Sequence, residues 1–449
     1  MSIQVGNTTA KITSQHGLFY DYLIQSQGEE KAKQYLQANE QAIQNIEKII
    51  KEENIDCDFQ RQDNYVYTLK QKELLNIKKE VEAVNSLGFP AKFVSNVNLP
   101  FRTLGAISFP NQAQFNPCKY ANGLIRAIRK QDKVFIFEKT KVVDVKNAKE
   151  EKYTVMTENG NNITAKYVVL ASHYPIINIP GYYFLKMYQE MSYLIAIETK
   201  MPLPKGMYIN SEKPTVSFRV AQNNEKELLL IGGMGHKTGE RKDISDSYEK
   251  LEAIAKQYYP DCIVKYRWCT EDCISLDKIP YIGEFSNLMP NVYLGTGYKK
   301  WGMTTSNVAA NIIVDKILGK KNSYEEVFTS TRLEPVKNHK ELGNMVKEVV
   351  TSWTVEKLKI PDDKLQDIKS GTGGLIEWED KKVGAYREEN GKLYIVKPVC
   401  SHLGCELTWN ILEKTWDCPC HGSRFTYKGK SIYDPSIKDL EVIEKEEEK

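Results

Sequence analysis

The sequence predicts a mixed α/β (α+β) lobe followed by a small all-β domain. The chain has 449 residues, and a typical domain has about 150, so two or three domains are expected. Helix-like and strand-like patterns mix over residues 1–335, and short strands with turns fill residues 366–445. The polar stretch 336–365 between them is expected to form a helix and a linker.

Two amphipathic helices are expected early in the large lobe. The segment Glu29–Glu52 carries apolar residues at the three-to-four spacing that one buried helix face requires. The segment Glu73–Leu87 repeats this pattern, and Tyr65–Leu69 between the two reads as a short strand. The lobe therefore opens with helices that surround its first strand.

Strands dominate the middle of the large lobe. The expected strands are Val134–Phe137, Lys141–Val145, Tyr153–Thr157 and Tyr167–Leu170, with more strands over residues 190–235. A helix is expected at about Asp246–Gln257. The strand Asn291–Leu294 and the helix Ser306–Leu318 close the lobe. In the small domain, Asn390-Gly391 between two apolar runs predicts a β-hairpin.

The overall charge excludes some classes of partner. Lys and Arg number 62 against 59 Asp and Glu, a balance of +3, so a strong electrostatic field for nucleic acid is not expected. The sequence has no apolar run near the ~20 residues that span a bilayer. The first residues also lack the apolar core of a signal peptide. We therefore expect a cytoplasmic protein without a membrane span.

Cysteine and histidine cluster near the C-terminus. Four of the nine cysteines lie within 21 residues, beside two of the six histidines. They form two strings, C-x-H at Cys400 and His402, and C-x-x-H at Cys418 and His421. Thiolate and imidazole ligands from two loops suit a metal centre. Zinc is one candidate, because two Cys and two His make a tetrahedral site. The alternative without a metal is that these are ordinary cysteines and histidines of the core.

These strings, with "HLGC" and "CPCHGS" between residues 400 and 423, closely resemble the Rieske iron–sulfur domain over residues 366–445. The resemblance implies a [2Fe-2S] cluster in which Cys400 and Cys418 hold one iron. By the same resemblance, His402 and His421 hold the other iron. Cys405 and Cys420 match the pair that forms a disulfide in one subgroup of the family.

The resemblance also bears on the reduction potential. Ser423 stands where high-potential members place a hydroxyl group near the cluster, and hydrogen bonds to the sulfurs raise the potential. Two residues later those members have a tyrosine, whereas this chain has Phe425. We therefore expect a potential below that of the respiratory Rieske proteins.

Other Rieske classes fit the sequence poorly. A respiratory-complex subunit needs a membrane anchor, and no such apolar run is present. A Rieske oxygenase needs a mononuclear iron bound by two histidines and a carboxylate, but the four remaining histidines do not pair at ligand spacing. A plain Rieske ferredoxin would need only about a hundred residues. The residues before the Rieske domain must therefore be explained separately.

A glycine loop carries the best clue to the function of these residues. The string NVYLGTGYKKWGMTTS, from Asn291 to Ser306, joins a strand to an apolar helix, and such a junction suits a carbonyl group or an anion. Upstream lie DKIPYIG at Asp277–Gly283, YVVLASH at Tyr167–His173 and TTAKITSQHG at Thr8–Gly17. This order resembles the D-amino-acid-oxidase-like family of FAD proteins, most closely members with a C-terminal Rieske domain.

The resemblance implies a set of flavin contacts. They are Ser14, Gln15, His16 and Gly17 near the flavin ring, and Gly295, Gly297, Gly302, Met303 and Thr304 in the glycine loop. His16 is either a flavin contact or a histidine that is merely hydrogen-bonded. Lys299, Lys300 and Trp301 either shape the mouth of the site or belong to a solvated loop. No catalytic residue is nominated.

The chain departs from this family at its start. The family opens with a strand and a G-x-G-x-x-G loop on the FAD pyrophosphate, which would take roughly sixty residues before Thr8. Seven residues precede Thr8 here. The glycines of Ile231–Gly239 do not open an apolar helix and are expected in a strand and turn. We therefore expect a truncated FAD-binding oxidoreductase lobe that lacks a central strand of its parallel sheet.

Together the resemblances imply an FAD-dependent oxidoreductase with an iron–sulfur centre. Its flavin would oxidise a small organic, amine-like substrate, and its cluster would pass the electrons singly to a redox partner. Two alternatives stay open. One is a Rieske electron-transfer protein whose large lobe is structural and flavin-free. The other is one half of a split flavoenzyme that a separate N-terminal chain completes.

Overall fold

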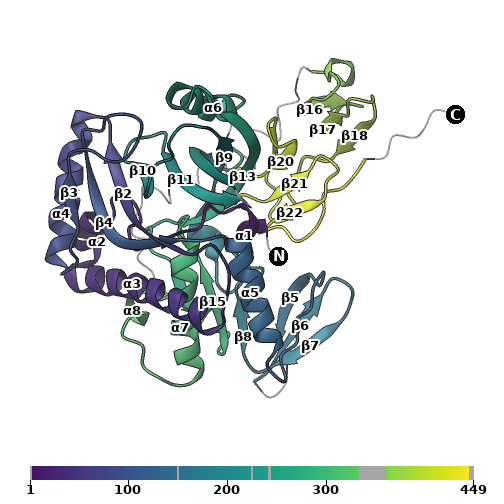
Figure 1. Ribbon diagram of the computed structural model, residues 1–449. Helices are drawn as coiled ribbons and strands as arrows, with labels where there is room; N and C mark the ends of the chain where they lie inside the picture. Colours follow the sequence, from purple (N-terminus) through teal and green to yellow (C-terminus); the bar gives the residue numbers. More distant parts are fainter. Residues whose placement is uncertain are drawn as a thin grey trace.

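The computed structural model describes residues 3–148, 151–223, 226–240, 244–332, 343, 361 and 363–443. A large lobe with an extended sheet lies beside a small β-rich domain near the C-terminus (Figure 1). This is the predicted fold class. The linker predicted at 336–365 lies almost wholly outside the described residues, as do the last two residues of the predicted 366–445 domain.

Eight helices occur among the described residues, and most flank the sheets. They are α1 (Ile3–Asn7), α2 (Tyr20–Gln27), α3 (Glu29–Glu52), α4 (Leu74–Ser86), α5 (Pro117–Arg129), α6 (Ser247–Tyr258), α7 (Gly302–Ile317) and α8 (Glu325–Phe328). The predicted helix at residues 29–52 is confirmed at both ends. The helix predicted from Ser306 begins four residues earlier, at Gly302, because buried Thr304 and Thr305 continue its inner face.

A nine-stranded sheet forms the centre of the large lobe. Its strands are β1 (Lys11–Ile12), β2 (Gln60–Thr68), β3 (Lys92–Val94), β4 (Gly105–Gln114), β9 (Met187–Glu198), β10 (Met207–Asn210), β11 (Val216–Asn223), β12 (Lys226–Lys237) and β13 (Ile263–Ser275). The order is β1-β4-β2-β10-β11-β12-β9-β13, with β3 on β4. Only β2 and β10 pair in parallel. Helix α6 packs on one face through Leu251 and Ala255.

A smaller sheet carries the predicted glycine loop. Its strands are β8 (Val168–Leu170), β14 (Tyr281–Glu284) and β15 (Val292–Thr296). Strand β15 pairs in parallel with β8 and antiparallel with β14. Among the described residues β8 pairs with no second strand, and its Val169 side chain is 46% exposed. A parallel sheet is normally buried, so this apolar edge is unusual.

One predicted strand is wrong. Strands β5 (Val142–Asn147) and β6 (Tyr153–Thr157) form as expected, and β7 (Asn162–Ala165), which was not predicted, pairs with β6. The segment Val134–Phe137 is irregular instead, with Phe135 79% exposed and Phe137 65% exposed. An apolar run becomes a strand only where a neighbour completes its hydrogen-bond ladder, and the described strands leave this segment unpaired.

The small domain consists of two antiparallel sheets. One holds β16 (Gly373–Trp378), β17 (Lys381–Arg387) and β18 (Leu393–Val396). The other holds β19 (Thr408–Asn410), β20 (Thr415–Asp417), β21 (Arg424–Thr426) and β22 (Ser431–Tyr433). The hairpin predicted at Asn390-Gly391 joins β17 to β18. The cysteine–histidine strings form the two loops that enter β19 and β21.

Helix α2 begins directly after the Ser14–Gly17 segment, and a buried acid holds its first turn. Glu80 of α4 accepts hydrogen bonds from the backbone N–H groups of Phe19, Tyr20 and Asp21 at 2.6, 2.8 and 2.9 Å. These N–H groups have no partner within their own helix, so the carboxylate takes the place of a cap. Glu80 thereby fixes where the chain leaves the predicted flavin contacts.

Glu80→Ala is expected to destabilise the fold by about 3 kcal/mol, because it leaves buried backbone donors without an acceptor. Glu82→Ala is the matched control, since Glu82 is exposed on the same helix, and should change stability by less than about 0.5 kcal/mol. Urea unfolding measures both values. Equal, small effects of the two substitutions would show that the cap is unimportant.

Candidate metal centre and flavin-facing loops

The two cysteine–histidine loops have the same backbone hydrogen-bond pattern. In the first, the N–H of Cys400 donates to Cys405 O at 2.8 Å, and the N–H of Gly404 donates to Cys400 O at 2.9 Å. In the second, Cys418 bonds to Ser423 and Gly422 bonds to Cys418 at the same two distances. Both glycines have positive φ angles, 77° and 83°, a conformation that favours glycine. The two ligand strings therefore form equivalent loops.

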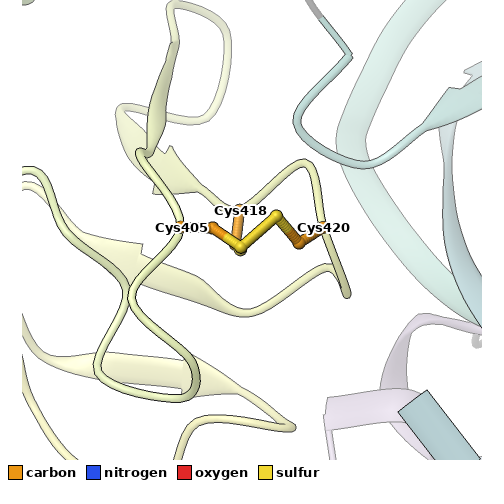
Figure 2. Close-up of side chains that lie close together, drawn as sticks. All are labelled: Cys405, Cys418 and Cys420. Atoms are coloured by element: carbon orange, nitrogen blue, oxygen red, sulfur yellow. A yellow bond between two sulfur atoms is a disulfide. The ribbon is translucent and has the colours of Figure 1, made fainter. Parts of the chain in front are cut away.

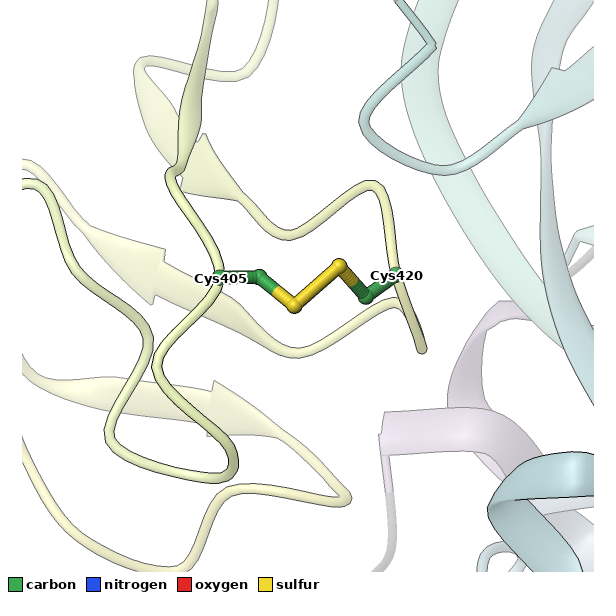
Figure 3. Close-up of a disulfide and its surroundings, with 2 residues drawn as sticks. All are labelled: Cys405 and Cys420. Carbon is green, nitrogen blue, oxygen red and sulfur yellow. A yellow bond between two sulfur atoms is a disulfide. The ribbon is translucent and has the colours of Figure 1, made fainter. Parts of the chain in front are cut away.

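A disulfide joins these loops. Cys405 and Cys420 are bonded, with a sequence separation of 15 and 6.5 Å between their Cα atoms (Figure 3). The sulfur of Cys418 lies beside this bridge, since the three sulfur atoms are within 4.8 Å of one another (Figure 2). The bridge occupies two of the three sulfurs and leaves Cys418 as a free thiol.

The two histidines present unpaired nitrogen atoms to the same region. The His402 and His421 rings lie 5.1 Å apart, edge to face. The Nδ1 atoms of both are buried and have no hydrogen-bond partner in the part of the chain described. Burial lowers the pKa of His402 to about 4 and that of His421 to about 3. Both imidazoles are thus neutral at pH 7, the form that binds a metal.

The free cysteines complete the donor set. Cys400 and Cys418 are buried and hydrogen-bonded to each other. That bond and the N–H groups of His402 and Leu403 lower the pKa of Cys400 to about 7. Burial and the neighbouring sulfur raise the pKa of Cys418. Two thiols and two neutral imidazoles with unpaired nitrogens fit the ligands that a Rieske cluster requires.

The segment predicted to face a flavin is buried and bonded within the protein. His16 Nδ1 pairs with the Tyr35 hydroxyl at 2.6 Å, and Nε2 pairs with Thr13 O at 2.9 Å. Its ring also stacks on Trp301 at 5.0 Å. Both ring nitrogens of His16 therefore have partners within the protein. The stacking also shows that Trp301 is not part of a solvated loop.

The neighbours of His16 are fixed in the same way. The Ser14 hydroxyl donates to Glu40 at 2.6 Å, and Gln15 accepts from Asn64 Nδ2 at 2.6 Å. Gly17 has a φ angle of 84°, which lets the chain turn into α2. These contacts hold the segment Ser14–Gly17 in place, and it forms a wall beside the first helices.

The glycine loop meets this wall. Gly295 lies in β15, Gly297 has a φ angle of 72°, and Gly302 begins α7. Met303 packs with the core beside β1, and the Thr304 hydroxyl donates to Thr13 O at 3.2 Å. Two segments nearly 300 residues apart therefore form one site.

Lys299 of the glycine loop, which was expected either at the mouth of the site or in a solvated loop, is half-buried. The Lys299 ammonium lies 4.0 Å above the ring of Phe19. Burial lowers the pKa of Lys299 to about 7, and neighbouring Lys278 contributes to the shift. The amine can therefore gain or lose a proton near neutral pH, whereas a lysine in a solvent-exposed loop would stay charged.

The structure also brings three unpredicted residues to the cluster loops. Asn178 Oδ1 lies 2.9 Å from His402 Nε2, and the Phe184 ring contacts both imidazoles edge-on. Gln189 of β9 donates to His421 O at 3.0 Å and to Asp434 O at 2.6 Å. All three belong to the large lobe, so no local spacing in the sequence could have identified them.

The contact between lobe and small domain extends along β13. Within the small domain, Arg424 Nε pairs with Asp417 at 3.1 Å, and Arg424 Nη1 lies 3.6 Å from Cys269 Sγ of the large lobe. The Tyr248 hydroxyl donates to Glu413 at 2.8 Å. A Cβ atom on Gly239 would lie 2.5 Å from the backbone nitrogen of Pro419, so only glycine permits this approach. The two parts share a closely packed junction.

Family models match both parts of the chain. The FAD dependent oxidoreductase model matches residues 5–316, and the Rieske [2Fe-2S] domain model matches residues 359–444. The first match covers more than half of the chain. The chain belongs to the FAD-dependent oxidoreductase family. Its C-terminal part is a Rieske domain, as the ligand strings and the two loops indicated.

Relatives and solved structures agree with this family. The Rieske 2Fe-2S iron-sulfur protein YhfW of Bacillus subtilis is 37% identical over 438 residues, which are 98% of this chain and 86% of YhfW. Glycine oxidase from Geobacillus kaustophilus superposes with a TM-score of 0.61 at 16% identity, over 73% of this chain and 88% of the oxidase. L-proline dehydrogenase from P. horikoshii gives 0.56 at 16% identity, over 67% and 84%.

Family membership fixes the cofactors. The Rieske domain implies a [2Fe-2S] cluster, and the oxidoreductase lobe implies FAD. The cluster has a complete donor set here. For FAD, the flavin-facing segments meet, but the 449 residues contain no G-x-G-x-x-G string for the pyrophosphate. Within the described residues, no helix is long and apolar enough to cross a membrane.

Cys400→Ser is expected to remove the Rieske signal from the electron paramagnetic resonance spectrum of the reduced protein, because one iron loses a thiolate ligand. Cys262→Ser is the matched control, since Cys262 is a free cysteine of the large lobe, and it should leave the signal unchanged. A Rieske spectrum retained in the Cys400 variant would contradict the ligand assignment.

Glu271 of β13 predicts how stability depends on pH. It is fully buried at the junction, and neither carboxylate oxygen has a hydrogen-bond partner among the described residues. Burial raises its pKa from 4.5 to about 8, although Arg424 acts against the shift. Between these values the folded chain keeps a proton that the unfolded chain releases, so the free energy of unfolding falls as pH rises.

Glu271→Gln is expected to flatten that decline between pH 5 and pH 8, because the amide cannot ionise. Denaturant unfolding at both pH values measures the difference. Glu249→Gln is the control at an exposed position of α6, and it should preserve the wild-type slope. An unchanged slope in the Glu271 variant would show that this carboxyl does not control the pH dependence.

Proposed function

We propose that the chain is an oxidoreductase that couples a two-electron oxidation to one-electron transfer. In this proposal the FAD-dependent oxidoreductase lobe oxidises a small organic, amine-like substrate. The Rieske cluster passes the electrons singly to a redox partner. The flavin site removes two electrons at once, whereas the cluster carries one at a time. Passing the electrons on singly is therefore the physical reason to join these domains.

One observation carries the proposal. The histidine loops of the Rieske domain pack against β9 of the oxidoreductase lobe, where Gln189 donates to the backbone of His421. Strand β9 pairs with β13, and Cys273 of β13 accepts a hydrogen bond from the N–H of Lys299 at 3.0 Å. Lys299 belongs to the glycine loop. Two strands therefore connect the predicted flavin contacts to the cluster loops.

The substrate class rests on the family. Glycine oxidase and L-proline dehydrogenase share the fold, and their names specify amino acids. FAD, when bound, supplies hydride acceptance from such molecules. The chain's own residues would shape the site: Ser14, Gln15, His16 and Gly17 form one wall, and Gly295, Gly297, Gly302, Met303 and Thr304 form the loop opposite.

A second candidate is a Rieske electron-transfer protein whose large lobe is structural and flavin-free. The bonding of His16 favours it, because both ring nitrogens already have protein partners. The cluster would then exchange electrons with two external partners.

A third candidate is a flavoenzyme half that a separate chain completes. The exposed edge of β8 favours it, since Tyr167 and Val169 are exposed and, in the described structure, no strand pairs with the edge of β8 that faces away from β15. A strand–loop–helix unit with G-x-G-x-x-G would both cover this edge and bind the pyrophosphate. Such a partner would restore the central strand of the sheet.

Cofactor content separates the three candidates. For the leading proposal we expect about two iron and two sulfide ions per chain, with a flavin band near ~450 nm. Cluster bands without flavin would favour the structural lobe. Flavin that appears only with a co-purified polypeptide carrying G-x-G-x-x-G would favour the split enzyme. A colourless, iron-free protein would contradict all three.

A further inference from the structure

The second partner of a cluster histidine comes from the other domain. A metal-bound histidine usually donates its remaining N–H to a carbonyl or carboxylate, which fixes the tautomer and the ring orientation. For His402, Nδ1 is unpaired and buried, and Nε2 lies 2.9 Å from Asn178 Oδ1. A hydrogen on Nε2 that donates to Asn178 leaves the lone pair of Nδ1 free for iron.

Two further residues of the large lobe, Phe184 and Gln189, contact the histidine loops of the small domain. Phe184 places its ring 6.3 Å from that of His402 and 5.6 Å from that of His421, nearly perpendicular to both. Gln189 bridges two carbonyls, those of His421 and Asp434. A Cβ atom on Gly422 would lie 2.5 Å from Gln189 Cβ, so the loop approaches β9 at a distance that only glycine allows.

We propose that Asn178 and Gln189 are positioning residues for the cluster. They hold its histidine edge against the oxidoreductase lobe and close that edge to external redox partners. The proposal deepens the proposed function and rests only on its iron–sulfur half. It concerns how the cluster is oriented and covered, and it does not depend on whether flavin is bound.

This arrangement determines where electrons can enter and leave. The covered edge faces β9, which β13 links to the glycine loop through Cys273 and Lys299. The external partner must therefore approach another side of the small domain. A Rieske domain that swings between two partners would need a weak, exposed contact, whereas the contact here includes buried Gln189, Glu271 and Arg424.

Chemical modification tests whether the edge is covered. Diethyl pyrocarbonate reacts with accessible imidazole nitrogens, and Nε2 is the free nitrogen when Nδ1 binds iron. In the intact, cluster-loaded protein we expect slow modification of His402 and His421, measured by mass spectrometry of their peptides. Asn178→Ala and Gln189→Ala are expected to speed it about tenfold, the equilibrium effect of one lost hydrogen bond.

Matched variants separate positioning from general damage to the fold. Asn178→Asp keeps an acceptor oxygen for His402 Nε2 and should restore protection. Asn162→Ala and Gln131→Ala are the controls, because both residues are exposed on the large lobe far from the contacts described. A second measurement is the quadrupole coupling of the outer histidine nitrogen in pulsed electron paramagnetic resonance, which reports its hydrogen bond. It should change in Asn178→Ala and remain unchanged in both controls.

The outcomes are distinguishable from failure of the proposed function. A cluster-loaded protein whose histidines are modified as fast in the wild type as in Asn178→Ala overturns the positioning roles alone. An unchanged nitrogen coupling in Asn178→Ala does the same. A protein without iron overturns this proposal together with the iron–sulfur half of the function. Protein with a cluster but no flavin leaves the expected protection intact.

Discussion

The account depends on two imidazoles whose Nδ1 atoms are buried without partners. An unpaired buried nitrogen costs free energy unless a ligand satisfies it, and here two such atoms belong to the same two loops as two free thiols. The hydrogen bonds within the two equivalent loops and the Cys405–Cys420 bridge between them hold these donors together. Zinc would also accept two Cys and two His, but the match to the Rieske family identifies the cluster.

The junction between the domains adds a constraint that neither domain has alone. The outer nitrogen of His402 finds its acceptor in Asn178 of the large lobe, so the orientation of one cluster ligand depends on docking. Close approaches at Gly239 and Gly422 exclude any larger residue. The buried ion pair between Arg424 and Asp417 at the same interface is costly to break, because either partner alone would be an uncompensated buried charge. The small domain is therefore packed together with the large lobe as one structural unit.

Local patterns predicted much of this structure. The helix Glu29–Glu52 was predictable because its apolar stripe has helical spacing throughout. The Rieske domain was predictable because six residues at fixed spacing form a specific motif. Val134–Phe137 failed because an apolar run does not reveal whether a partner strand exists. Asn178, Phe184 and Gln189 were not predictable, since their role arises only when chain segments more than 200 residues apart meet.

Mössbauer spectroscopy of the reduced protein, enriched in ⁵⁷Fe, tests the central claim most directly. The account predicts two iron environments of equal area: a ferric site with four sulfur ligands and a ferrous site with two histidine nitrogens. Two equivalent sulfur-bound irons would contradict the assignment of His402 and His421 as ligands. A single mononuclear iron, or none, would contradict the cluster itself.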